Sequence, residues 1–93
     1  MDSADVLAAF ERERALLAGL DHPGIARLVD GGRVPDGRPF LAMEYVDGEP
    51  ITAFADRRQL PVEDRLALFV DVCRAVAHAH RHLVVHRDLK PSN

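Results

Sequence analysis

The segment His86-Arg87-Asp88-Leu89-Lys90-Pro91-Ser92-Asn93 decides the interpretation of this chain. It places a carboxylate, an ammonium group and a carboxamide within six residues, at Asp88, Lys90 and Asn93. A carboxylate can accept a proton, and a carboxamide oxygen can bind a hard metal ion. The structural alternative is an ordinary turn capped by Asp88 and Asn93 next to Pro91.

Residues 61–82, just upstream, predict a long helix. Apolar or weakly polar side chains recur at helical spacing at Leu66, Phe69, Val70, Cys73, Val76, Ala77 and His80. Pro61 suits the first turn, and Glu63 and Asp64 favour the positive end of the helix dipole. Cys73 lies on this stripe and is expected to be a small buried apolar residue.

The first half of the chain predicts one helix and a hairpin. Residues 5–20 show helical periodicity, which Gly19 and residues 21–24 end. Two strands are expected within 25–34 and 40–46, joined by the turn Val34-Pro35-Asp36-Gly37. Residues 51–58 predict a short helix.

Composition excludes several classes of protein. The 93 residues carry 12 basic and 15 acidic side chains, a net charge of −3 with the signs interspersed, whereas a nucleic-acid binder needs a basic face. No apolar run approaches the ~20 residues that span a bilayer, and the acidic start lacks a secretory signal. We therefore expect a cytoplasmic chain. The single cysteine excludes an internal disulfide.

The segment 86–93 resembles the catalytic loop of protein kinases, His-Arg-Asp-Leu, three residues, Asn. With Lys90 and Pro91 it is similar to the eukaryotic-type (Hanks-type) serine/threonine kinases, in the style of bacterial ones. The resemblance implies transfer of the ATP γ-phosphate to protein serine or threonine hydroxyls. It implies Asp88 as catalytic base, Lys90 steadying the phosphate and Asn93 as a Mg²⁺ ligand.

Other segments resemble the family in the same order. Glu13 lies nine residues before His22-Pro23, where the family has the αC glutamate that pairs with an ATP-binding lysine. Strand 40–46 resembles the strand that enters the hinge. Met43 would then be the gatekeeper, with Glu44 and Val46 offering backbone groups to adenine. Taken alone, Glu13 is a solvated helix charge and Met43 a core residue.

The resemblance thus implies an α+β fold that is part of a kinase domain. It would hold the αC helix, the β4–β5 hairpin, the hinge, αD, the long αE helix and the start of the catalytic loop. Residues 5–46 would belong to the N-lobe and hinge, and 47–93 to the start of the C-lobe. The sequence contains no Gly-rich phosphate loop, no second lysine and no Asp-Phe-Gly. We therefore expect a kinase fragment that is inactive alone.

Two alternatives stay open. In the first, the chain is a kinase-derived module that docks on a partner protein without catalysis. In the second, His78 and His82, which are i, i+4 neighbours on the predicted helix, belong to a zinc site. His86 is expected to pack beneath the catalytic loop. Unpaired strand edges and the apolar stripe of the long helix favour self-association. The protein substrate, the regulatory inputs and any membrane anchor of a longer parent are not predicted.

Overall fold

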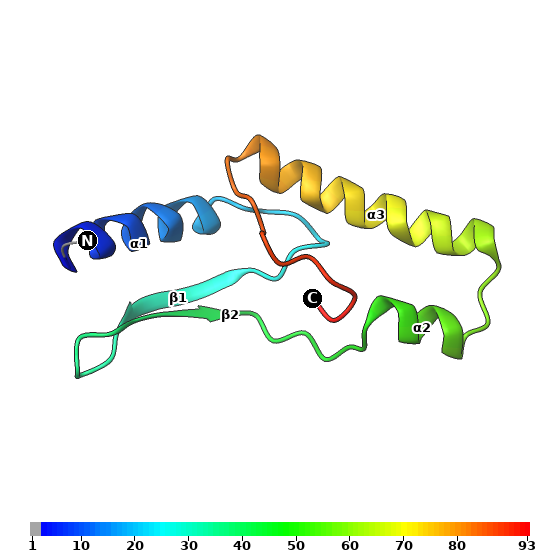
Figure 1. Cartoon of the computed structure of the whole chain (residues 1–93), viewed down its shortest axis with the longest axis horizontal. Helices are drawn as coiled ribbons and strands as arrows, with labels where there is room; N and C mark the ends of the chain where they lie inside the picture. Colours follow the sequence, from blue (N-terminus) through cyan, green and yellow to red (C-terminus); the bar gives the residue numbers. More distant parts are fainter. Residues whose placement is uncertain (1–2) are drawn as a thin grey trace.

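The computed structural model describes residues 3–93, which form three helices and a two-stranded sheet. The elements are α1 (Ser3–Ala18), β1 (Leu28–Arg33), β2 (Pro39–Met43), α2 (Ile51–Arg57) and α3 (Val62–Arg81). Figure 1 shows α1 beside the hairpin at one end and α2 with α3 at the other. The predicted α+β arrangement and its five elements are confirmed.

The hairpin forms where the sequence predicts it. Its strands pair antiparallel, and Gly32 lies opposite Phe40. In the connecting turn, the Gly37 N–H donates to the Val34 carbonyl at 2.9 Å. Gly37 has φ +92°, a conformation that side chains with a Cβ rarely adopt, so glycine suits this position.

Both strands are shorter than expected, because a side chain replaces the backbone at one end of the ladder. The Glu44 N–H donates to the Arg27 carbonyl at 2.7 Å, which continues the pairing beyond Met43. The Arg27 N–H, however, donates to the Glu44 carboxylate at 3.3 Å rather than to a carbonyl. The regular ladder therefore begins at Leu28 and ends at Met43.

Helix α3 agrees with the prediction in its bounds but not in the face that it buries. Ala75 is buried, whereas Leu66 and Phe69 on the predicted stripe are 58% and 62% exposed. Cys73 is exposed too, so the expectation that it is buried is wrong for this structure. The face that meets the rest of the chain carries Ala75 and His78, one turn apart.

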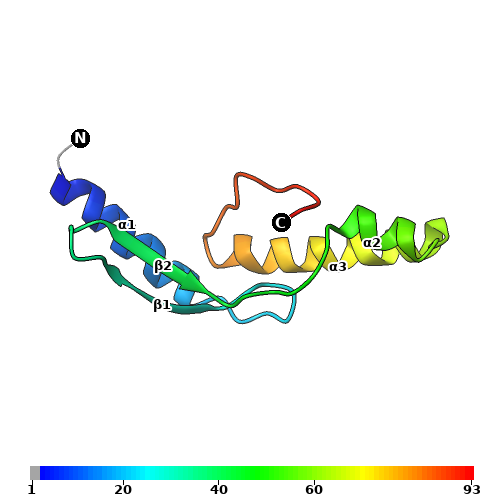
Figure 2. The ribbon, with the colours of Figure 1, turned by 90° about the horizontal axis from the view of Figure 1, so that it is seen from below.

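The molecule is elongated and has little core of its own. Its extents are 51 × 27 × 23 Å. Figure 2 shows α1 and the hairpin at one end of the long axis and α2 at the other. The accessible surface is 7356 Å², against roughly 5,400 Å² for a compact monomer of this mass. Among the described residues only Ala55 and Ala75 are buried apolar residues. No helix within 3–93 is long and apolar enough to cross a membrane.

The loop that follows α1 joins the two ends of the molecule. Gly24 lies so close to α3 that a Cβ on it would come within 3.2 Å of the Ala75 Cβ. The neighbouring Asp21 N–H donates to Nε2 of His78 at 3.3 Å. We call residues 21–25 the junction loop. Because the junction loop packs on α3, it links the end of the molecule that contains α1 to the end that contains α2.

We expect Gly24→Val to destabilise the chain. The added side chain would meet the Ala75 methyl and the His22 ring, which a helix and a hydrogen bond hold in place. Overpacking of this kind costs about 1–3 kcal/mol of the free energy of unfolding, measured by urea denaturation.

Gly48→Val is the matched control. Gly48 lies in the exposed linker after β2, and the nearest atom to an added Cβ there is 3.7 Å away. Equal losses of stability in the two variants would contradict a close junction at Gly24.

Candidate active site

The segment 86–93 returns from the end of α3 toward the start of α2. Leu83 adopts φ +66°, and the Val84 N–H donates to the Ala79 carbonyl at 2.9 Å, so the chain folds back after α3. Further on, the Pro91 carbonyl accepts the Ile51 N–H at 3.1 Å. Figure 1 shows this segment between α3 and the linker that leads into α2. The segment is thus held against the residues that follow the hairpin.

Hydrogen bonds within the segment fix its backbone. The Asp88 N–H donates to Nδ1 of His86 at 3.0 Å, and the Asn93 side-chain amide donates to the Asp88 carbonyl at 2.8 Å. The Asn93 N–H also donates to the Lys90 carbonyl at 2.9 Å. Arg87 has φ +71°, a strained conformation for a residue with a side chain and one that clusters at functional sites.

These backbone bonds leave three functional groups open to solvent. Lys90 Nζ lies 3.5 Å from Oδ2 of Asp88, and both side chains are more than half exposed. Because Asn93 uses its NH₂ group to hold the Asp88 carbonyl, its amide oxygen is left as a ligand for a hard cation. The segment therefore presents an exposed carboxylate, an exposed ammonium group and an amide oxygen of the kind that binds hard cations.

Within residues 3–93, no three His, Cys, Asp or Glu side chains are grouped so that they could hold a metal ion. A Mg²⁺ ion at Asn93 would accordingly need further oxygen ligands, which in a kinase include the nucleotide phosphates.

The predicted hinge residues follow β2 in an extended linker. Met43 ends the strand opposite Leu28. The Glu44 N–H is occupied by the Arg27 carbonyl, which leaves the Glu44 carbonyl as its remaining main-chain group. Val46 is 65% exposed and makes no backbone hydrogen bond to another described residue. The linker can therefore offer a carbonyl and an N–H to the edge of a planar ring.

Glu13 is exposed on α1, on the side that faces the segment after α3. It lines a shallow pocket together with Ala9, Arg12, Leu16 and residues 83–87. Helix α1 thus lies beside the start of the segment 86–93. The structure does not bring Glu13 together with a lysine, because the only lysine is Lys90.

His86 differs from the expectation that it packs beneath the loop. The His86 side chain is exposed, and Nδ1 of its ring accepts a hydrogen bond from the Asp88 N–H. A short-range hydrogen bond, rather than apolar packing, determines its position here.

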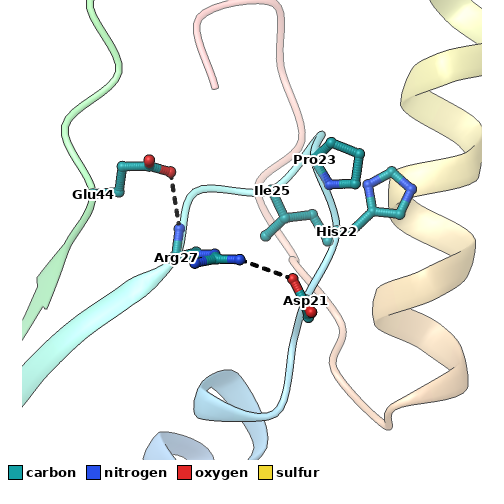
Figure 3. A pocket seen from close by; sticks show the side chains of 6 residues that line it. All are labelled: Asp21, His22, Pro23, Ile25, Arg27 and Glu44. Carbon is teal, nitrogen blue, oxygen red and sulfur yellow. Dashed lines mark hydrogen bonds and ion pairs between the residues drawn. The ribbon is translucent and has the colours of Figure 1, made fainter.

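Sequence reasoning missed the cluster at the junction loop. The His22 and His78 rings lie 5.3 Å apart between centroids, and the His78 and His82 rings lie 4.4 Å apart. Figure 3 shows His22 directed toward α3 and Asp21 directed toward Arg27 on the other side of the loop. The Asp21 carboxylate and the Arg27 guanidinium are 3.2 Å apart. The i, i+4 spacing of His78 and His82 was a visible signal, but nothing local links them to His22.

The linker before α2 carries a second pair that sequence reasoning missed. Glu49 accepts hydrogen bonds from Arg57, and this bond together with the charge of Glu49 raises the pKa of Arg57 above its ordinary value. The pair ties the residues after the hinge to α2.

Comparison with known sequences gives one consistent result. Residues 2–93 match the family model of the protein kinase domain. The chain is 42% identical over 92 residues to the DNA damage-responsive serine/threonine-protein kinase RqkA of Deinococcus radiodurans, covering 90% of this chain and 13% of that protein. It is 37% identical to serine/threonine-protein kinase PknB of Mycolicibacterium smegmatis, covering 90% of this chain and 14% of that protein.

The fold is similar to that of a solved kinase. The chain superposes on the crystal structure of the PknI kinase domain of Mycobacterium tuberculosis with a TM-score of 0.73 and 37% identity. The match covers 99% of this chain and 38% of that one. The chain therefore spans about a seventh of its full-length relatives and just over a third of a solved kinase domain.

We expect Lys90→Met to leave stability nearly unchanged. Its ion pair with Asp88 is exposed, and such pairs contribute at most about 1 kcal/mol to the free energy of unfolding. Urea denaturation measures the change.

Arg65→Met provides the comparison. Arg65 donates to the Asp56 carboxylate and to the carbonyls of Leu60 and Ala55. Its loss should cost about 1–2 kcal/mol. A larger loss from Lys90→Met than from Arg65→Met would mean that Lys90 is a structural residue.

Proposed function

Because this chain belongs to the protein kinase family, with bacterial serine/threonine kinases among its relatives, we propose that it supplies the hinge and catalytic loop of an ATP-dependent serine/threonine kinase. The observation that carries the proposal is the grouping of Asp88, Lys90 and Asn93 on one hydrogen-bonded segment beside α2. Phosphoryl transfer depends on positioning and charge stabilisation, which a segment fixed in this way supports.

In this proposal each polar residue of the loop has a separate role in phosphoryl transfer. The Asp88 carboxylate accepts the proton of the attacking serine or threonine hydroxyl, and the Lys90 ammonium stabilises charge on the transferred phosphate. The Asn93 amide oxygen would hold Mg²⁺, which neutralises negative charge on the phosphates when bound. The bond from Asn93 to the Asp88 carbonyl keeps the proton acceptor and the metal ligand in register.

The linker after β2 is proposed to hold adenine. The Glu44 carbonyl and the Val46 main chain would hydrogen-bond the edge of the base, and Met43 would close the back of the site. Support comes from Val46, which is exposed and makes no backbone hydrogen bond to another described residue, and from the Glu44 N–H, whose bond to Arg27 leaves the Glu44 carbonyl without a backbone partner.

Glu13 is proposed to orient an ATP-binding lysine, as in the family. The 93 residues hold no second lysine, Gly-rich loop or Asp-Phe-Gly, so we propose that this polypeptide tested alone transfers no phosphate. The division into an N-lobe part, 5–46, and a C-lobe part, 47–93, belongs to the same proposal. It is supported by the contacts of α1 with both strands.

Protein serine and threonine side chains are the proposed substrates. We also propose that the isolated polypeptide self-associates, because apolar side chains on α3 are exposed. A cytoplasmic location is proposed as well, because ATP is produced and held there.

A chimeric kinase tests the proposed roles. Residues 5–93 would replace the corresponding segment of the M. tuberculosis PknI kinase domain, and transfer of labelled phosphate to protein would be measured. We expect serine/threonine phosphorylation, and Asp88→Asn should lower kcat about 10²- to 10⁴-fold by removing the proton acceptor.

Asp71→Asn is the matched control, because Asp71 is an exposed aspartate on α3 that pairs with Arg74 of the same helix at 3.7 Å. A folded chimera without activity, or one that keeps full activity after Asp88→Asn, would refute the proposal.

Val46→Pro tests the adenine site in the same chimera. Proline removes the backbone N–H, so the KM for ATP should rise about tenfold through the loss of one hydrogen bond. Val46→Ala keeps the N–H and should leave this KM nearly unchanged. Equal effects of the two substitutions would place adenine elsewhere.

A further inference from the structure

One imidazole nitrogen, on His78, binds the junction loop to α3, and a second, on His22, accepts a hydrogen bond within the loop itself. Nε2 of His78 accepts the Asp21 N–H at 3.3 Å, and Nδ1 of His22 accepts the Gly24 N–H at 2.9 Å. An imidazole nitrogen can accept a hydrogen bond only while it carries no proton. Both bonds therefore require neutral rings.

The third histidine of the cluster, His82, makes a hydrogen bond that does not require a neutral ring. Nδ1 of His82 lies 2.8 Å from the His78 carbonyl, which can only accept, so this nitrogen carries the proton. His82 thus stays bonded whether its ring is neutral or charged. Its ring lies 4.4 Å from the ring of His78, and a positive charge on either one opposes a charge on the other.

The titratable and charged groups around His78 come from both packed elements. Helix α3 contributes His82 and Arg81, and the junction loop contributes His22 and Asp21. Asp21 is the one anion among them, and Arg27 pairs with its carboxylate at 3.2 Å. The surroundings of His78 are thus mostly basic.

We propose that His78 is a positioning residue whose neutral ring holds the junction loop on α3, and that acid releases this loop. The geometry carries the proposal, because protonation of Nε2 removes the acceptor of the Asp21 N–H and adds a positive charge beside His22 and His82. Figure 3 shows the loop where it would separate from α3. Since this loop links the two ends of the molecule, its release loosens α1 relative to the segment 86–93.

The electrostatic surroundings act in the same direction. Partial burial lowers the pKa of His78, His82, His22 and Arg81 lower it further, and Asp21 raises it. A lowered pKa means that the unfolded chain binds more protons than the folded chain just below the ordinary histidine value, about 6.5. Stability contributed by His78 is therefore complete above that pH and is lost as the pH falls below it.

Amide exchange and ring titration by NMR on the 93-residue chain test the proposal. Between about pH 8 and about pH 5.5, we expect the protection factor of the Asp21 amide to fall about fivefold, as for the loss of one hydrogen bond. His78→Gln supplies an amide oxygen that accepts at any pH, so this variant should hold the loop and lose the pH dependence.

His80→Gln is the matched control, because His80 is an exposed histidine of the same helix outside the cluster. It should keep the pH dependence of the unaltered chain. An Asp21 amide that is unprotected at both pH values, or equal pH dependence in His78→Gln, overturns the proposal. If His78→Gln does not fold, the ring of His78 in the unaltered chain decides. A titration midpoint at or above about 6.5 overturns the proposal, and a lower one supports it. None of these readouts depends on kinase activity.

Discussion

The contact of Gly24 with Ala75 is the point on which the arrangement of this molecule depends. Helix α1 packs on the hairpin, and α2 leads into α3, but the two ends share little buried surface. The junction loop bridges them because glycine allows its backbone to approach α3 and because His78 accepts the Asp21 N–H. A second link, from Ile51 to the Pro91 carbonyl, holds the segment 86–93 near the linker after β2. These two narrow contacts hold the two ends of the molecule together.

This construction suits a site whose chemistry needs several groups around one phosphate. Asp88, Lys90 and Asn93 come from one segment with its own hydrogen bonds, so their mutual geometry is local. The linker after β2 and Glu13 come from other parts of the chain, and their distance from the segment depends on the junction. In a phosphoryl-transfer enzyme, displacement of such groups costs rate even when each one is present.

Most of the fold could be predicted from the sequence, because its elements are determined locally. Three local signals led to the expected structure: the apolar periodicity of 61–82 predicted α3, a glycine follows the end of α1, and the Pro-Asp-Gly sequence forms the turn of the hairpin. Each of these signals acts over a few residues. The grouping of Asp88 with Lys90 and Asn93 is likewise a property of one short segment. The roles assigned to these residues remain predictions.

What could not be predicted depends on partners distant in the sequence. Periodicity locates an apolar stripe on α3 but not the surface that it meets, and here the contact face carries Ala75 rather than Cys73. The bond from Asp21 to His78 joins residues 57 apart, and no local pattern predicts it. The exposure of His86 has the same origin, because its bond to Asp88 is local whereas the burial expected of it needs other elements.

A nuclear Overhauser measurement between the Gly24 α-protons and the Ala75 methyl group of the 93-residue chain tests this account most directly. We expect a strong cross-peak near neutral pH, because a Cβ at Gly24 would lie only 3.2 Å from the Ala75 Cβ. Absence of that cross-peak, while the resonances of Val62–Arg81 still report a helix, would contradict it. The two ends of the molecule would then not be joined at the junction loop.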